Sequence, residues 1–260
     1  MKNKLKDKIA VVSGATSGIG RAIAEALRQN GVRVINISKD ATDTEFFKSY
    51  QCDISNDAEL TEVIEDLKNI CQPDFVFCNA GFGTGGTVVN TAVEDIDKLF
   101  NVNLIAHVKM IKLLAPSVKN GGKIFFTGSL ASVIPLPYQA CYSASKAAIE
   151  NFSRALNTEL KPRKIQVCTI MPGDIRTNFT DARIYPEQCT EREAHGIAKM
   201  KKAERSGDSP DIVGKLALKL VRKRKIPLRV SVGFGNKVLV LLVKLLPLRL
   251  VNYLVEKIYV

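Results

Sequence analysis

The first strand and the turn after it, residues 9–20, place the tightest constraint on the fold of this chain. Ile9 to Val12 is an apolar run typical of a buried strand, and the glycine-rich turn Gly14-Ala15-Thr16-Ser17-Gly18-Ile19-Gly20 follows it. Apolar residues then recur at helical spacing until Gly31, which predicts a helix. Such a turn brings bare backbone to the positive N-terminus of a helix, where a dinucleotide pyrophosphate can bind. A plain tight connection is the alternative, and the position at the first strand favours the dinucleotide site.

Apolar strand patterns alternate with helical patterns along the rest of the chain. This alternation predicts an α/β fold: one Rossmann-like, doubly wound, mainly parallel seven-stranded sheet with helices on both faces. The expected strands are 9–13, 32–37, 49–52, 75–78, 123–127, 166–171 and 228–232. Long helices are expected at 103–114 and 139–160, and the connection between strands two and three is too short for a full crossover helix. The length of 260 residues and the 46% hydrophobic content suit one large domain.

Tyr142 and Lys146 form the pair with the clearest chemical meaning. Positions i and i+4 share a helix face, so the Lys146 ammonium would lie beside the Tyr142 phenol and lower its pKa from the ordinary value of ~10. Ser129 lies thirteen residues upstream of Tyr142. Taken alone, Tyr-x-x-x-Lys is also a common pair on helix surfaces.

Together, the glycine turn and the Tyr142–Lys146 pair resemble the short-chain dehydrogenase/reductase family. Further family elements follow in order at Cys52-Asp53-Ile54, Cys78-Asn79-Ala80-Gly81, Asn103 and Pro172-Gly173-Asp174-Ile175-Arg176-Thr177, with Cys78 replacing an Asn. The likeness runs from about residue 6 to residue 177. It implies the catalytic tetrad Asn103, Ser129, Tyr142 and Lys146. It also implies cofactor contacts from Gly14, Thr16, Ser17, Gly18, Ile19, Gly20, Ser38, Lys39, Asp53, Ile54, Asn79, Ala80, Gly81, Tyr142, Lys146, Pro172, Gly173, Ile175 and Thr177.

The resemblance also implies a role for each member of the tetrad. Ser129 would hydrogen-bond the substrate carbonyl, and Tyr142 would give that oxygen a proton as hydride arrives from the nicotinamide. Lys146 would lower the pKa of Tyr142 and hold the nicotinamide ribose, while Asn103 would anchor a water that passes protons to Lys146.

The end of the second strand indicates which cofactor is used. Family members that use NAD carry an acid there, whereas this chain has Ser38 followed by Lys39, which favours NADP(H) over NAD(H).

Two segments near the C-terminus shape the expected substrate and assembly. The polar stretch 176–209 has no strong period and lies where the family covers its substrate, so it is expected to be a lid within a dehydrogenase domain of residues 1–235. The apolar-basic extension 236–260 is expected to form two short helices broken at Pro247, similar to the tails of members that act on steroids and other lipids. The family's helices 103–114 and 139–160 pack against a second subunit, so a homodimer or higher homo-oligomer is expected.

The positive charge is concentrated at the C-terminal end. The formal net charge is +12, and residues 199–260 carry fifteen Lys and Arg against four Asp and Glu. We find no nucleic-acid-binding motif, so an anionic substrate or an anionic membrane surface explains the charge better than a nucleic acid, and a solvated basic surface is the alternative. For the extension itself, packing on the protein's own core or on a partner subunit is favoured over peripheral contact with a membrane.

The remaining sequence features argue against a secreted, disulfide-bonded or metal-binding protein. The start of the chain has no apolar signal segment, which favours the cytoplasm. The six cysteines form no Cys-x-x-Cys pair, and several lie in apolar strand patterns, so they are interpreted as reduced and structural. With only His107 and His195 available, no metal site is expected, and His107 is interpreted as a packed or interface histidine.

Three other functions compete with a dehydrogenase of lipid-like ketones: a 3-oxoacyl carrier-protein reductase, a non-catalytic NADP-binding regulatory module, and a serine hydrolase. The last lacks a Gly-x-Ser-x-Gly elbow at Ser129.

Overall fold

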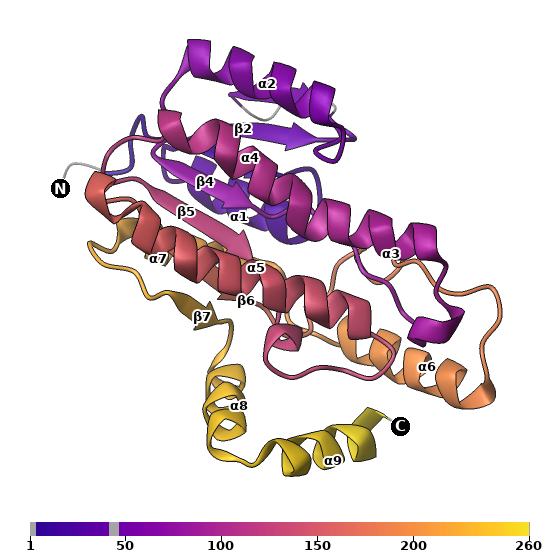
Figure 1. Cartoon of the computed structure of the whole chain (residues 1–260). Helices are drawn as coiled ribbons and strands as arrows, with labels where there is room; N and C mark the ends of the chain where they lie inside the picture. The colour runs from indigo at the N-terminus through magenta and orange to yellow at the C-terminus, as the bar shows by residue number, and fades with distance from the viewer. Residues whose placement is uncertain (1–3, 42–46, 260) are drawn as a thin grey trace.

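A seven-stranded parallel sheet forms the centre of the protein (Figure 1). The structure, a computed structural model, describes residues 4–41 and 47–259. The strand order is β3-β2-β1-β4-β5-β6-β7, and every neighbouring pair is parallel. The strands are β1 (Ile9–Ser13), β2 (Arg33–Ser38), β3 (Lys48–Gln51), β4 (Phe75–Cys78), β5 (Lys123–Thr127), β6 (Gln166–Met171) and β7 (Arg229–Ser231). The chain runs outward from β1 to β3 and then restarts beside β1 at β4, so the strand order reverses between β1 and β4, where ligands bind in such sheets.

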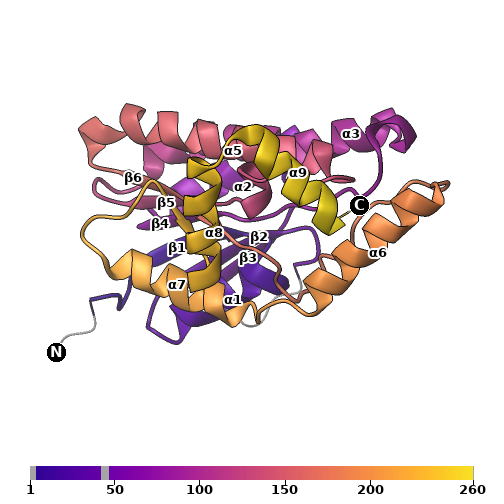
Figure 2. The ribbon, with the colours of Figure 1, turned by 90° about the horizontal axis from the view of Figure 1, so that it is seen from below.

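Helices cover both faces of the sheet (Figure 2). One face packs against α2 (Asp57–Ile70), α4 (Ala106–Leu114) and α5 (Ala140–Glu159), and the other packs against α1 (Gly18–Arg28) and α7 (Asp211–Arg222). Strand β1 serves both layers: Ile9 and Val11 face the first, and Ala10 and Val12 face the second. The two-residue period of a strand therefore becomes a continuous apolar run, because both faces are buried.

The predicted fold is confirmed, and the strand bounds agree closely. Four strands match in full, and the three predicted at 32–37, 49–52 and 228–232 lie at Arg33–Ser38, Lys48–Gln51 and Arg229–Ser231. The connection from β2 to β3 contains no helix in its described residues, 39–41 and 47. The rest of that prediction falls on residues 42–46, outside the described part of the chain.

The helix predicted at 103–114 is the second half of a longer helical run. The run begins with α3 (Val93–Phe100), passes through one turn of π-helix at Asn101–Ile105, and continues as α4. The predicted helix therefore began ten residues too late, although Val93, Ile96, Leu99 and Phe100 of α3 lie at helical spacing. The helix predicted at 139–160 is confirmed as α5, Ala140–Glu159.

The segment 176–209 is more regular than its sequence suggested. It contains α6 (Glu191–Arg205), whose Thr190 side chain accepts a hydrogen bond from the Glu193 amide at 3.2 Å. Thr190-x-x-Glu193 is a sequence signal for the start of a helix. Although the segment has no strong apolar period, these fifteen residues are therefore helical.

The extension forms two helices separated by Pro247, as predicted. These are α8 (Phe234–Leu245) and α9 (Leu248–Tyr259), and they lie outside the layers that cover the sheet (Figures 1 and 2). No helix in the described residues is long and apolar enough to cross a bilayer. The division into a domain 1–235 and an extension 236–260 stays a prediction, and α8 itself begins two residues earlier, at Phe234.

Candidate active site

The glycine turn after β1 adopts a conformation that only small residues permit. Gly14 and Gly18 have φ values of +71° and +52°, and a Cβ at Gly20 would lie 2.0 Å from the Gly14 carbonyl oxygen. Ser17 begins α1 without a side-chain cap, and the first turn carries no acid. The first amide groups of α1 are therefore free of a side-chain cap or anion, as a pyrophosphate would require. The predicted contact residues Thr16, Ser17 and Ile19 are partly or fully exposed along this turn.

The turn after β4 is fastened to the ends of β1 and β5. The Asn79 amide donates to the Ser13 hydroxyl at 2.9 Å, and the Thr127 hydroxyl donates to Asn79 Oδ1 at 2.9 Å. The Ala80 amide also donates to Ser13, at 3.1 Å. These bonds bring three strand ends together. A Cβ at Gly81 would lie 2.8 Å from Asn103 Oδ1, so only glycine allows this approach.

Asn103 lies in the single turn of π-helix between α3 and α4 and is fully buried. Its Oδ1 accepts from the Phe82 amide at 3.1 Å, and its Nδ2 donates to the Phe82 carbonyl oxygen at 2.9 Å. Nδ2 also donates to the Ser145 hydroxyl of α5 at 3.3 Å. The local bulge, a feature frequent at functional sites, thus ties the helical run to α5 and to the turn after β4.

Ser129, Tyr142 and Lys146 converge at the end of β5 and the start of α5. The Lys146 ammonium donates to the Thr127 carbonyl oxygen at 3.0 Å and lies 5.7 Å from the centre of the Tyr142 ring. Ser129 hydrogen-bonds the Tyr142 phenol, and its hydroxyl accepts from the Ala131 amide at 3.1 Å. The structure therefore brings together the tetrad that the sequence predicted.

The electrostatics of Tyr142 differ from the sequence expectation. Burial raises the pKa of Tyr142, while the Arg183 charge and the Ser129 hydrogen bond act in the opposite direction. Arg183, and not Lys146, makes the largest favourable contribution to the phenolate. Burial also lowers the pKa of Lys146 to about 8, so this side chain loses its charge more easily than an ordinary lysine. The expectation of a Tyr142 pKa lowered by Lys146 is wrong for this structure, because desolvation outweighs the nearby cations.

His107 is a packed core residue on α4, as the sequence interpretation favoured. Its Nε2 lies 2.7 Å from the Ala80 carbonyl oxygen, and its Nδ1 has no hydrogen-bond partner among the described residues. Burial lowers the pKa of His107 to about 4, so the ring is neutral at physiological pH.

The residues predicted for the adenosine end meet where β2 and β3 end. The Ser38 hydroxyl is buried and donates to Asn36 Oδ1 at 2.6 Å, which turns it away from solvent. The Lys39 side chain is 63% exposed and pairs with Asp53 at 2.7 Å. Ile54 is buried next to Asp53. The hydrogen bond to Lys39 lowers the pKa of Asp53 against the cost of its partial burial.

The turn after β6 reaches the glycine turn. A Cβ at Gly18 would lie 3.3 Å from the Thr177 side chain, so the two turns touch. The Pro172 carbonyl oxygen accepts from the Leu130 amide at 2.9 Å, which joins this turn to the residue after Ser129. The end of β6 thus lies at the same edge of the sheet as the ends of β1, β4 and β5.

The same turn is also held from the C-terminal side. A Cβ at Gly173 would lie 2.6 Å from the Asn236 amide nitrogen of α8, and Ile175 forms a bridge with Asp208. All four predicted residues of this turn, Pro172, Gly173, Ile175 and Thr177, therefore border the site.

A buried ion pair lies against Tyr142, and no sequence pattern predicted it. The Arg183 guanidinium lies 5.1 Å from the centre of the Tyr142 ring and 4.8 Å from that of Phe179. It forms an ion pair with Glu204 of α6 and donates to the Thr84 carbonyl oxygen at 3.3 Å. Arg183 and Glu204 are 21 residues apart in a charge-rich stretch, and no local pattern singles them out.

We predict that this pair holds segment 176–209 in place. In Arg183→Met, the Glu204 carboxylate, only 10% exposed, would remain buried without a partner, so the free energy of unfolding should fall by about 3–5 kcal/mol. Urea unfolding followed by circular dichroism measures the change. The double variant Arg183→Met/Glu204→Gln should recover part of the loss.

A matched control lies on the same helix. Arg205 pairs with Asp181 at 3.0 Å, but both side chains are about two-thirds exposed, at 66% and 68%. Arg205→Met should therefore change the free energy of unfolding by less than about 1 kcal/mol. Equal effects for Arg183→Met and Arg205→Met would contradict the structural role.

Known proteins share both the sequence pattern and this architecture. The family model described as short chain dehydrogenase matches residues 8–187. The 3-ketodihydrosphingosine reductase of Bacteroides thetaiotaomicron is 31% identical over 239 residues, which cover 88% of this chain and 89% of that protein. The NADPH-dependent 1-acyldihydroxyacetone phosphate reductase of Saccharomyces cerevisiae is 33% identical over 193 residues, 69% of this chain and 65% of that protein. The crystal structure of a short chain dehydrogenase/reductase from Burkholderia phymatum in complex with NAD superposes with a TM-score of 0.82 at 24% identity, covering 92% of this chain and 93% of that one.

Proposed function

The chain belongs to the short chain dehydrogenase family of oxidoreductases, and we propose that its substrate is a hydrophobic ketone or the matching secondary alcohol. The observation that carries this proposal is the convergence of Asn103, Ser129, Tyr142 and Lys146 beside an uncapped helix N-terminus. A bound nicotinamide cofactor would supply or accept the hydride. The glycine cradle and the open start of α1 fit the cofactor's pyrophosphate.

Each polar side chain has a position suited to its proposed role. Ser129 would hydrogen-bond the substrate oxygen, and Tyr142 would donate the proton that this oxygen needs as it becomes a hydroxyl. The proton lost from Tyr142 leaves a phenolate, which the Arg183 and Lys146 charges stabilise. Asn103 would hold the proton path toward Lys146, because its amide links the turn after β4 to α5.

Three observations support a lipid-like substrate. Apolar and aromatic side chains surround Tyr142, among them Phe82, Leu136 and Phe179. The apolar helix α9 packs on Ile134, in the loop between Ser129 and Tyr142. The Bacteroides relative that matches nearly the whole chain is named as a reductase of 3-ketodihydrosphingosine, a long-chain ketone. We propose that segment 176–209 covers such a substrate.

The test is a screen of the purified protein with NADPH and with NADH. Long-chain 3-ketones, keto-steroids, bile-acid ketones and small diketones should be compared by kcat/KM. We expect turnover of the hydrophobic ketones and much weaker turnover of the small diketones. Best activity on short acyl thioesters would instead identify a 3-oxoacyl carrier-protein reductase. Cofactor binding without any turnover would identify the regulatory module, which the complete tetrad argues against.

We propose NADP(H) as the preferred cofactor because Lys39 is the first charged side chain after β2. It is exposed and held near the strand end by Asp53, and no acid stands at Ser38 to bind a ribose hydroxyl. The named NADPH dependence of the yeast relative supports the same choice. In this arrangement Lys39 can turn from Asp53 to a 2'-phosphate.

Lys39→Ala should weaken NADPH binding by about ten- to hundredfold and leave NADH nearly unchanged. A charge-assisted contact to phosphate contributes roughly 1.5–3 kcal/mol, and NADH lacks that phosphate. Fluorescence titration gives both dissociation constants. Lys48→Ala, which removes a similar ion pair with Asp66, is the control. Equal losses for both cofactors would show that Lys39 serves only the turn, and a wild-type preference for NADH would overturn the proposal.

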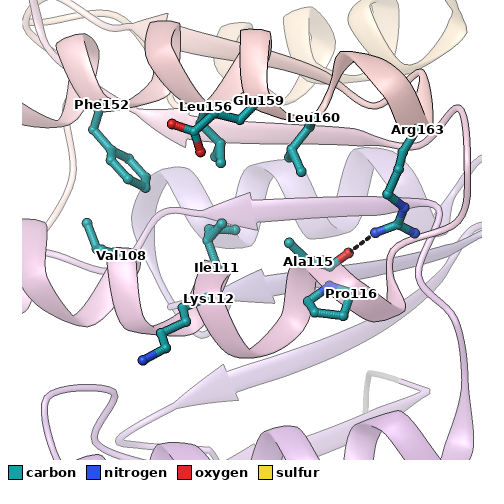
Figure 3. A pocket seen from close by; sticks show the side chains of 10 residues that line it. All are labelled: Val108, Ile111, Lys112, Ala115, Pro116, Phe152, Leu156, Glu159, Leu160 and Arg163. Atoms are coloured by element: carbon teal, nitrogen blue, oxygen red, sulfur yellow. Dashed lines mark hydrogen bonds between the residues drawn. The ribbon is translucent and has the colours of Figure 1, made fainter.

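We propose a homodimer or higher homo-oligomer built on α4 and α5. The two helices border a groove lined largely by apolar side chains (Figure 3). The groove shares no residue with the candidate active site. Its lining residues are Val108, Ile111, Lys112, Ala115, Pro116, Phe152, Leu156, Glu159, Leu160 and Arg163.

We propose that the enzyme lies in the cytoplasm, with its C-terminal extension free to contact the inner face of the membrane.

A further inference from the structure

The extension carries most of the exposed apolar surface of the described residues. Eighteen large hydrophobic side chains are exposed among the described residues, and eleven of them lie on α8 and α9. They are Phe234, Val238, Leu239, Leu241, Leu242, Leu245, Leu248, Leu250, Tyr253, Leu254 and Ile258. Leu245 and Leu248, on either side of Pro247, are 73% and 77% exposed. A soluble protein rarely leaves so large an apolar surface without a partner.

Only a narrow stripe of each helix packs on the rest of the protein. On α9, Val251 and Val255 are one turn apart and pack against Ile134. The neighbouring stripe, one residue earlier at Leu250, Leu254 and Ile258, is exposed. On α8, only Val240 is buried. The extension is therefore anchored by one face and presents a second apolar face outward.

The charges on this surface are almost all positive. Lys237, Lys244, Arg249 and Lys257 are exposed, while the one acid of the two helices, Glu256, pairs with Arg192 of α6 at 3.6 Å. A second copy of the chain on the same surface would bring cations against cations. Lipid phosphates would instead neutralise them while the apolar side chains entered the acyl boundary.

We infer that α8 and α9 form a docking surface for an anionic membrane. Each helix has only twelve residues, so the pair lies along the interface with its apolar face inserted. The basic side chains then stand at the level of the headgroups, where long aliphatic stems can keep the charge in water.

The docking surface borders the candidate active site at the start of α8 and the proposed lid segment 176–209 at the end of α9. Asn236, at the start of α8, lies against the turn at Gly173, and Tyr259, at the end of α9, lies beside Gly196 of α6. Docking would therefore hold this side of the active site against the lipid. Only this placement of the active site against the lipid rests on the proposed function, because the placement matters only for a substrate that resides in the membrane.

The test is flotation of the full-length protein with vesicles. Mixed phosphatidylglycerol–phosphatidylcholine vesicles should bind the protein at low salt, and binding should weaken at high salt and with pure phosphatidylcholine. Lys244→Gln/Arg249→Gln should lower the partition coefficient about twentyfold, at roughly fivefold for each charge. Lys6→Gln/Lys215→Gln, at two exposed lysines outside the extension and outside the groove on α4 and α5, should leave it almost unchanged.

The apolar contribution is tested separately. Leu245→Ser/Leu248→Ser/Leu254→Ser should abolish vesicle binding at every salt concentration. Val89→Ser/Val93→Ser is the control. The two side chains are 92% and 67% exposed, and they lie outside α8 and α9, just before and at the start of α3. Should the triple variant fail to fold, the charge variants and the salt series still decide.

Two results would overturn the inference. Full-length protein that ignores anionic vesicles at low salt excludes a membrane surface. Loss of oligomers by gel filtration in the triple variant, without vesicle binding in the wild type, would assign the surface to a second copy of the chain. Neither readout measures turnover, so the docking inference and the proposed function can fail independently.

Discussion

Tyr142→Phe should reduce kcat by about 10²- to 10⁴-fold while leaving cofactor affinity nearly unchanged. The variant keeps the ring that packs on Phe179 and Arg183 but loses the hydroxyl that donates the proton. Steady-state kinetics with a hydrophobic ketone measure the rate, and fluorescence titration measures the cofactor. Since the ring remains, the free energy of unfolding should change by no more than about 1.5 kcal/mol.

Tyr185→Phe provides the control for Tyr142→Phe. The Tyr185 hydroxyl donates a hydrogen bond to the Thr180 carbonyl oxygen at 3.2 Å. It lies near the Arg183–Glu204 ion pair, as Tyr142 does, but has no proposed role in proton transfer. This variant should keep most of the wild-type rate. A Tyr142→Phe enzyme that retained more than about a hundredth of the wild-type kcat would disprove the acid–base assignment.

Lys146→Met should lower kcat and weaken cofactor binding together. The ammonium is buried, donates to the Thr127 carbonyl oxygen and faces the Tyr142 ring, so Met fills the space but removes both the charge and the donor. We expect a loss of at least about a hundredfold in kcat, within the range of positioned proton transfer. An unchanged cofactor affinity would rule out the second role, contact with the nicotinamide ribose.

The pH dependence gives Lys146→Met a second readout. Burial lowers the pKa of Lys146 to about 8, so the side chain is charged below that pH and neutral above it. The charged form stabilises the phenolate left after proton donation, so the rate of ketone reduction should fall as pH rises through about 8. Lys146→Met should lack this inflection, whereas Lys161→Met, on a surface turn, should retain it. Identical profiles for wild type and Lys146→Met would assign the inflection to another group.

Local signals in the sequence were sufficient for the sheet and for the Tyr142–Lys146 pair. Strand and helix periods are set by nearest neighbours, and a glycine turn with positive φ at Gly14 and Gly18 requires the same residues in any context. The spacing of Tyr142 and Lys146 is itself a helical pattern, whereas Asn103 and Ser129 were assigned by the resemblance to the short-chain dehydrogenase/reductase family. The structure brings all four to one edge of the sheet.

The sequence patterns were less informative about where helices start and end in segments rich in polar residues. The capping pattern at Thr190 and Glu193 predicts α6, yet the low apolar content of 176–209 suggested an irregular stretch. Glu193 is buried and accepts from the Thr87 amide at 2.6 Å and from Asn90 at 2.9 Å. Such polar side chains are core residues here, which composition does not reveal because their partners lie about a hundred residues away.

What the sequence determined by itself was therefore the order of elements along the chain, the glycine turn and the two helices around Pro247, while the candidate tetrad came from the family resemblance. The tertiary structure alone decided which charge faces Tyr142, because Arg183 comes from a distant segment and burial, a property of the whole fold, sets the pKa of the phenol. It also decided which stripe of α9 is covered: Val251 and Val255 meet Ile134, while Leu250, Leu254 and Ile258, equally apolar, meet solvent. Local pattern marks a side chain as apolar, but only packing between distant segments determines whether anything covers it.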